Sequence, residues 1–266
     1  MIRSERLPKA GGGFSIIELL VAGLLGLVLI LAVSTLFIGT KRTYRLQEQL
    51  ATLQSEGRFA LMFLQHNIEN AGWVSNDASL GDNVLAIDFD GNCGAQLCTV
   101  EGGAAGNDVI KVQAEVAPGT VDCNGLATAG SVWSARFYVD GNNALVCEGS
   151  GGGAPQPVIE NVESFQVLYG LDTDSNGIVN QYVTAQEVVG TSQRSGTYDD
   201  VIAVQVALLV STEEDVSDEV LNRTFEVLDR SHNVGDKFVR RQFRQTILLK
   251  NKVYQMISIA AREGSL

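Results

Sequence analysis

The stretch Gly13-Phe14-Ser15-Ile16-Ile17-Glu18-Leu19-Leu20-Val21 joins a short polar leader to an apolar segment, and the rest of the chain is organised around it. The 21 residues from Leu19 to Gly39 contain no charged side chain. At a rise of about 1.5 Å per residue, a helix of this length crosses a hydrocarbon core of about 30 Å. The sequence therefore predicts a membrane helix over residues 14–40 that carries one carboxylate, Glu18.

The glycines at positions 11–13 precede the apolar run, whereas a secretory signal peptide has its small-residue cleavage site after that run. Cleavage after Gly13 would remove the basic leader, residues 1–13, and leave a new ammonium group on Phe14. A carboxylate in the apolar part of a membrane helix costs about 2.5–3.5 kcal/mol on insertion scales, so Glu18 is expected to have a partner. The alternative is an ordinary signal anchor with an isolated glutamate near the interface.

These residues resemble the start of type IV prepilins and pseudopilins. The resemblance implies that prepilin peptidase cleaves between Gly13 and Phe14 and that Phe14 is then N-methylated. It also implies that Glu18 meets the N-terminus of a neighbouring subunit when the helix leaves the bilayer for a fibre.

Beyond Lys41 an apolar stripe with helical spacing predicts that the helix continues over residues 41–72 as an amphipathic segment. Gly57 lies on the stripe and marks either a close approach to a sheet or a kink. The stretches Thr43–Glu48, Gln54–Ala60 and Asn67–Trp73 resemble the PilW family of minor type IV pilins. The stripe consists of Leu46, Leu50, Leu53, Gly57, Leu61, Leu64 and Ile68.

Charge and cysteine content describe an acidic, exported domain. The 266 residues carry a formal charge of −12, and loss of the leader leaves 16 Lys and Arg against 30 Asp and Glu, or −14. Such a chain is a poor general nucleic-acid binder. Four cysteines, all beyond the membrane helix, predict two disulfides. Of the three connectivities, we expect the most local one, Cys93 with Cys98 and Cys123 with Cys147.

Residues 73–266 are predicted to form a β-rich domain, because apolar and polar residues alternate in several runs bounded by turn residues. The section between residues 211 and 229 is acidic and is expected to be a loop with a short helix. A long helix followed by runs of strands indicates an α+β, type IV pilin-like fold, with an antiparallel sheet packed on the amphipathic half of the helix. The expected strands are 109–116, 135–139, 144–148, 162–169, 201–210 and 239–249.

One loop has the spacing of a cation site. Asp172, Asp174, Asn176 and Asn180 supply oxygen ligands at alternate positions around Gly177, as in the first half of a calcium loop. The twelfth position is Val183, so the bidentate glutamate of an EF-hand is missing, and a polar turn without metal is the alternative. Calcium is the one candidate cofactor, and otherwise none is expected.

Catalytic motifs are not found in the sequence, so the chain is not expected to be an enzyme. The two histidines, His66 and His232, lie far apart, and no nucleophile lies beside a base. A basic cluster lies between Phe238 and Lys252. It either prevents aggregation at a sheet edge or binds an acidic partner, and we expect that partner to be another pilin rather than DNA.

The sequence and the resemblance together predict a minor pilin of a type IV pilus in a Gram-negative bacterium. It would be held in the inner membrane by one helix, with its C-terminal domain in the periplasm, and later lie on the cell surface. Expected partners are prepilin peptidase, the major pilin, other minor pilins, the assembly platform and a large tip adhesin. Adhesion and twitching motility are the expected roles of such a fibre, and initiation of assembly is the expected role of the subunit. The alternatives are a minor pseudopilin of a type II secretion system and a membrane-anchored binding domain that does not polymerise.

Overall fold

The computed structural model describes residues 13–74, 86–89, 92–93, 96–102, 106–191, 200–217 and 219–254. Most of the expected leader, residues 1–12, therefore lies outside the described residues. The chain divides into two units, residues 1–48 and 49–266, and helix α1, Ile16–Glu69, contributes to both.

In the first unit, α1 has the composition of a membrane span. Its most apolar window has a mean hydropathy of 2.9, and none of that window is buried within the protein. The helix begins after Ser15, whose carbonyl oxygen accepts hydrogen bonds from the backbone N–H groups of Glu18 and Leu19. Length and exposed apolar surface fit a helix that is surrounded by lipid or by other helices.

In the second unit, the apolar stripe of α1 enters the core of the domain. Leu53, Ala60, Leu64 and Ile68 are buried together with residues from the strands. The helix ends at Glu69, and three residues later Gly72 adopts a positive φ of 74°, a conformation that glycine reaches without steric cost. The predicted helix of almost sixty residues is thus confirmed, at 54 residues.

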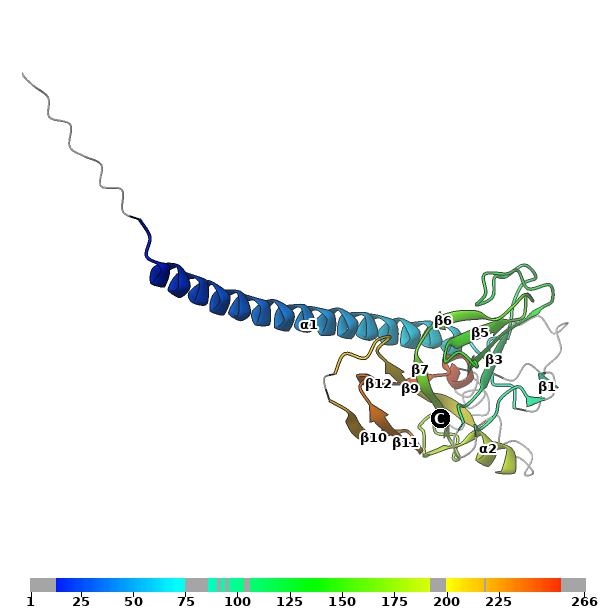
Figure 1. Cartoon of the computed structure of the whole chain (residues 1–266). Helices are drawn as coiled ribbons and strands as arrows, with labels where there is room; N and C mark the ends of the chain where they lie inside the picture. Colours follow the sequence, from blue (N-terminus) through cyan, green and yellow to red (C-terminus); the bar gives the residue numbers. More distant parts are fainter. Residues whose placement is uncertain are drawn as a thin grey trace, which may run out of the picture. The chain divides into compact units, whose positions relative to one another are not determined.

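The strands form two four-stranded antiparallel sheets (Figure 1), with the orders β12-β9-β7-β8 and β3-β4-β5-β6. All six predicted strands are present, and β6, β8 and a short helix, α2, were not predicted. The first sheet contains β7 Val162–Leu171, β8 Gln181–Val183, β9 Val201–Ser211 and β12 Arg240–Leu248. The second contains β3 Ile110–Glu115, β4 Val132–Val139, β5 Leu145–Gly149 and β6 Gln156–Ile159. The remaining elements include β1 Asn92–Cys93, β2 Gln96–Leu97 and α2 Ala185–Thr191.

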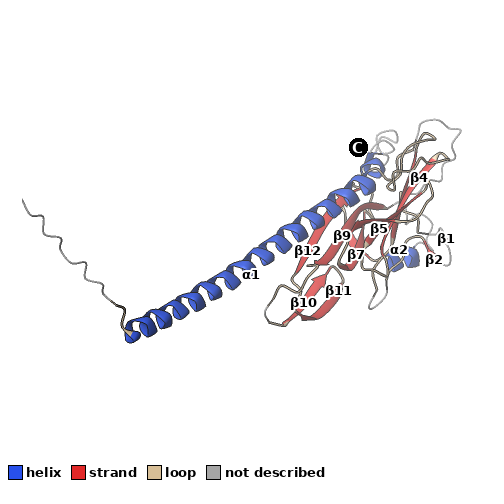
Figure 2. Cartoon of the chain, turned by 45° about the horizontal axis from the view of Figure 1, so that its top comes forward, coloured by secondary structure: helices blue, strands red, loops and turns tan. Residues whose placement is uncertain are grey.

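The prediction of a loop between residues 211 and 229 is wrong for the second half of this segment. There the chain forms β10, Leu221–Val227, which pairs with β11, Arg230–Asp236, as a hairpin (Figure 2). Val227 and the half-buried Phe225 pack against Ala207 and Leu209 of β9. Because the hairpin covers one face of β9 and the core covers the other, all 11 residues of β9 are buried. The prediction failed because the strands of the hairpin are mainly polar and exposed.

Two disulfides, Cys93–Cys98 and Cys123–Cys147, join the two local cysteine pairs. Helix α2 begins with a capping box, in which Thr184 Oγ1 accepts from the backbone N–H of Glu187 and Glu187 Oε2 accepts from that of Thr184. The fold is therefore α+β, a long apolar helix whose second part packs on an antiparallel sheet domain, as predicted.

Candidate functional site

The N-terminal candidate site consists of Gly13, Phe14 and Glu18. Phe14 is 86% exposed, and Glu18 lies in the first turn of α1 among exposed apolar side chains. No described residue forms an ion pair with Glu18. The positive end of the helix dipole favours a carboxylate here, but it supplies only a fraction of a charge.

Ser15 and Glu18 have the three-residue spacing of a capping box. A carboxylate at this position of a capping box can accept a hydrogen bond from the backbone N–H of the N-cap residue, which stabilises the first turn of a helix.

The candidate calcium loop joins β7 to β8, and its oxygens already accept hydrogen bonds. Buried Asp172 accepts from the backbone N–H groups of Asn176 and Gly177, at 3.1 and 2.7 Å. Burial acts to raise the pKa of Asp172, but these bonds outweigh it and hold the pKa below its ordinary value. Asp174 Oδ2 accepts from Asn176 Nδ2, and Asn180 Oδ1 accepts from the backbone N–H of Thr173.

This loop is closed as a turn by its own residues, with Ser175 and Gly177 at positive φ. Glu187, the nearest acidic residue after the loop, caps α2. Within the described residues there is no group of three or more His, Cys, Asp or Glu that could hold a metal ion. Two aspartates and two asparagines remain the available donors, and calcium here stays a prediction.

The basic cluster lies mostly on β12, which is an edge strand of its sheet. Arg240 is bound by Glu163 of β7 and by Asp236. Arg244 donates to Gln205, and Lys250 pairs with Glu69 at 2.7 Å. These bonds within the domain engage much of the charge, which favours the interpretation of a protected sheet edge over that of a partner site.

A buried polar cluster was missed by the sequence analysis. Asp108 is 2% exposed and accepts hydrogen bonds from the backbone N–H groups of Gly102 and Val167. Burial raises the pKa of Asp108 to about 7, and Glu101 adds to the rise. Arg230 of β11 binds Glu101 at 2.5 Å and so joins the hairpin to this cluster. No local sequence pattern indicates this cluster, because Arg230 lies far from Glu101 and Asp108 in the sequence.

Two grooves open on the second unit. One, of about 450 Å³, lies between the α1 turns that carry Leu53 and Glu56 and the segments that carry Glu160 and Glu213. Burial raises the pKa of Glu56, and Glu160 and Glu213 raise it further. The second groove, of about 550 Å³, is aromatic and lies at the C-terminal end of α1.

Part of the second unit is similar to a known protein family. Residues 136–251, from β4 to just beyond β12, match the family model described as Type IV Pilus-assembly protein W. Among solved structures, a type IV-like pilin from Thermus thermophilus is 17% identical, with a TM-score of 0.43. The alignment covers 78% of this chain and 97% of that one. No curated protein sequence matches the chain. Residues 136–251 are thus similar to the PilW family of type IV pilus-assembly proteins, and this similarity agrees with the resemblance in α1.

Proposed function

We propose that the chain is a minor pilin that prepilin peptidase cleaves after Gly13 and that helps to initiate assembly of a type IV pilus, at whose tip it stays. The observation that carries the proposal is the combination of two features in one chain. Its apolar helix has a carboxylate in its first turn without an ion-pair partner among the described residues, and its exported domain matches the PilW family.

The mechanism follows from the chemistry of α1. In the bilayer, the exposed apolar side chains of residues 19–39 bury their surface in lipid, which holds the subunit in the membrane. Cleavage creates an ammonium on Phe14, which N-methylation leaves charged. When a neighbouring subunit places this ammonium beside Glu18, the two charges pair with each other. If the two helices are displaced along their axes, each charge is left unpaired in an apolar environment. Glu18 thereby sets the axial position of one helix against the next.

The exported domain selects the partners. Other minor pilins, the major pilin, the inner-membrane assembly platform and a tip adhesin are the proposed contacts, with the domain on the periplasmic side before assembly. A minor pseudopilin of a secretion system has the same leader and helix, so the function of the fibre separates these two possibilities. Deletion of the gene is expected to reduce major pilin in the sheared surface fraction while exported enzyme activity in the medium stays normal.

The test of the mechanism is Glu18→Ala, with Glu48→Ala as the matched control. Both glutamates are exposed on α1, but Glu48 lies beyond the apolar segment. We expect Glu18→Ala protein to be processed and to stay in the membrane while it is absent from sheared pili, and Glu48→Ala protein to assemble normally. Incorporation of the Glu18→Ala protein at the wild-type level would remove the proposed role of Glu18 and would favour a membrane-anchored domain that does not polymerise.

A further inference from the structure

The Cys93–Cys98 disulfide joins the short strands β1 and β2, and its two sulfur atoms lie in different surroundings. Cys93 is half-buried, whereas Cys98 is 0% exposed. A thiol from solution therefore reaches the sulfur of Cys93 more readily than that of Cys98. Thiol–disulfide exchange depends on which sulfur is attacked and on access to it, so this difference gives the bond a preferred direction of opening.

Lys111 of β3 lies beside the buried sulfur. Its Nζ atom is 3.7 Å from Cys98 Sγ and 3.0 Å from Asp88 Oδ2, so one ammonium group contacts both a disulfide sulfur and a carboxylate. The side chain of Lys111 is 21% exposed, and water therefore screens its charge only in part. A lysine beside a sulfur stabilises its thiolate, which is the form in which a sulfur leaves a disulfide.

The segments on both sides of this disulfide are bound to β3 by contacts that do not involve the sulfurs. Before the disulfide, Asp88 donates its backbone N–H to the carbonyl oxygen of Lys111 at 3.0 Å. After it, Val100 and Val109 exchange two backbone hydrogen bonds of 2.9 Å. We therefore expect the flanking segments to stay on β3 when the disulfide opens, so that the second unit keeps its fold.

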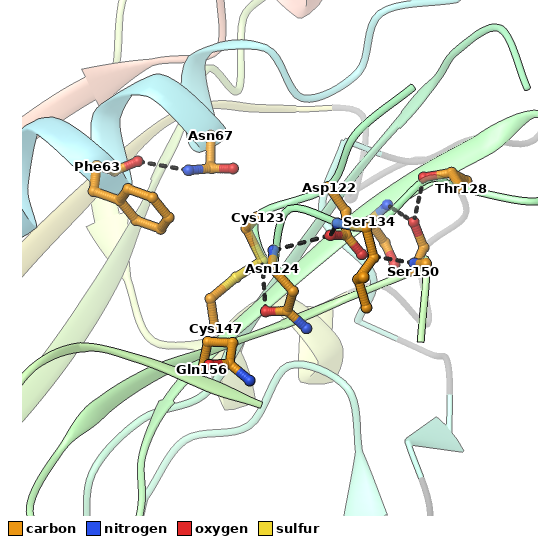
Figure 3. The surroundings of a disulfide bond; sticks show 12 residues. Phe63, Asn67, Asp122, Cys123, Asn124, Thr128, Ser134, Cys147, Ser150 and Gln156 are labelled. Carbon is orange, nitrogen blue, oxygen red and sulfur yellow. Dashed lines mark hydrogen bonds between the residues drawn. A yellow bond between two sulfur atoms is a disulfide. The ribbon is translucent and has the colours of Figure 1, made fainter. Parts of the chain in front are cut away.

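The second disulfide, Cys123–Cys147, provides an internal comparison. Cys123 is half-buried and Cys147 is 1% exposed, so the two disulfides are similar in access. They differ in charge, because no lysine or arginine among the described residues forms a hydrogen bond with a sulfur of the second disulfide. Figure 3 shows Asp122 and Asn124 close to this bond, and none of the residues labelled there is basic. A difference in exchange between the two disulfides is thus expected to arise from Lys111 rather than from access alone.

We propose that Cys93–Cys98 is an exchangeable disulfide that a small thiol opens by attack on Cys93. The thiolate of the small thiol bonds to Cys93 Sγ, the bond between the two protein sulfurs breaks, and its electron pair stays on Cys98 Sγ beside Lys111. The product is a mixed disulfide at Cys93. A second small thiolate then attacks the small-thiol sulfur of this mixed disulfide, which releases a disulfide of two small thiols and leaves Cys93 as a thiolate.

The two small thiols supply the two electrons that reduce the protein disulfide, and the protons that they lose on ionisation balance those that the two cysteine thiolates take up. Lys111 is a positioning residue in this step, since it stabilises the leaving sulfur and does not touch the attacking one. The proposal concerns a site on the second unit, and it stands whether or not the chain forms part of a pilus.

Asp88 limits the effect of Lys111, because its carboxylate pairs with the same ammonium group. Removal of the two charges should therefore have opposite effects. Without the ammonium of Lys111, the Cys98 thiolate loses its cation and exchange slows. Without the carboxylate of Asp88, the ammonium is more available to the thiolate and exchange becomes faster. A substitution that only loosened the local structure would expose the disulfide and accelerate exchange in both variants.

Reaction with reduced glutathione tests the proposal on the full, oxidised chain in non-ionic detergent. The protein would be mixed with about 5 mM glutathione at about pH 8, where part of the glutathione is thiolate. Samples taken at early times would be quenched with acid and alkylated with N-ethylmaleimide. Mass spectrometry of the peptides then gives the fraction of each disulfide that has opened and the cysteine that carries glutathione.

We expect Cys93–Cys98 to open at least about tenfold faster than Cys123–Cys147, with glutathione on Cys93 and the alkyl group on Cys98. Lys111→Gln should slow the opening at least about threefold, and Asp88→Asn should accelerate it. Lys111→Arg is the matched control, because it keeps the charge and should keep a rate close to that of the wild type.

The wild-type chain alone decides the direction of attack, so the test does not depend on the folding of a variant. Equal rates for the two disulfides, or glutathione found first on Cys98, would overturn the proposal. An unchanged or faster opening in Lys111→Gln would show that the ammonium does not act on the leaving sulfur and would overturn it as well.

Discussion

Substitution of Gly57 by alanine should destabilise the second unit, residues 49–266, although alanine is the better helix former. A β-carbon built at Gly57 lies less than 3.0 Å from three ring atoms of Phe243 on β12. The ring is half-buried and packs against the core, so it must shift to admit the methyl group. Overpacking of this kind costs about 1–3 kcal/mol, and we expect the upper half of that range because a rigid ring must shift. Alanine regains about 1 kcal/mol of helix propensity, so the net loss should be about 1–2 kcal/mol.

Thermal unfolding of the full chain in detergent, followed by tryptophan fluorescence, measures this loss in the second unit. A loss of this size lowers the midpoint by about 3–6 °C in a domain of this length. Gly141→Ala is the control, because no atom lies within 4 Å of its built β-carbon, and it should change stability by less than about 0.5 kcal/mol. Adding Phe243→Leu to Gly57→Ala should recover part of the loss. A Gly57→Ala protein as stable as the wild type, or additive effects in the double variant, would refute the steric argument.

Three further predictions concern stability. Replacing Cys123 and Cys147 by serine should cost about 3 kcal/mol, because the bond closes a loop with a sequence separation of 24, and chemical unfolding measures it. Between about pH 4 and 7, folded Asp108 keeps a proton that the unfolded chain releases, so the free energy of unfolding should fall by about 4 kcal/mol as the pH rises. In Asp108→Asn, the free energy of unfolding measured against pH should lose this slope. Arg240→Met should lower the free energy of unfolding by about 3 kcal/mol, because it leaves two carboxylates without their cation. Urea unfolding at pH 7 measures this loss, and Arg241→Met, at an exposed position, is the near-neutral control.

Elements with a regular pattern could be predicted from the sequence. The spacing of the stripe on α1 reports burial directly, and the apolar run of β9 reflects its burial on both faces, so both elements were predicted to within a few residues. Gly57 was also marked as a close approach or a kink, and the structure places Phe243 against it. The hairpin of β10 and β11 was not predictable in this way, because Val227 is its only buried residue, with Phe225 and Leu228 half-buried beside it.

The candidate sites differ in the same way: those made of residues close in the sequence could be predicted, and those assembled by the fold could not. The proposed cleavage and assembly residues, Gly13, Phe14 and Glu18, lie close together in the sequence, so their spacing carries information. The loop from Asp172 to Asn180 is likewise a local pattern of turn residues. The Asp108 cluster and the aromatic groove bring together residues that are distant in the sequence. Asn67 looks like an ordinary polar residue on an amphipathic helix until the fold places it against β3 and β4.

Strand β12 and the residues just after it attach the second part of α1 to the rest of the second unit. Phe243 packs on Gly57, Gln245 bonds to Gln65 at 2.6 Å, and Lys250 pairs with Glu69. These side-chain contacts engage β12 and the residue after its end with α1, which leaves the edge strand less free to pair with another chain. If the chain assembles through its apolar helix as proposed, an open strand edge would offer a second, unspecific mode of association, and the contacts of β12 with α1 would limit it.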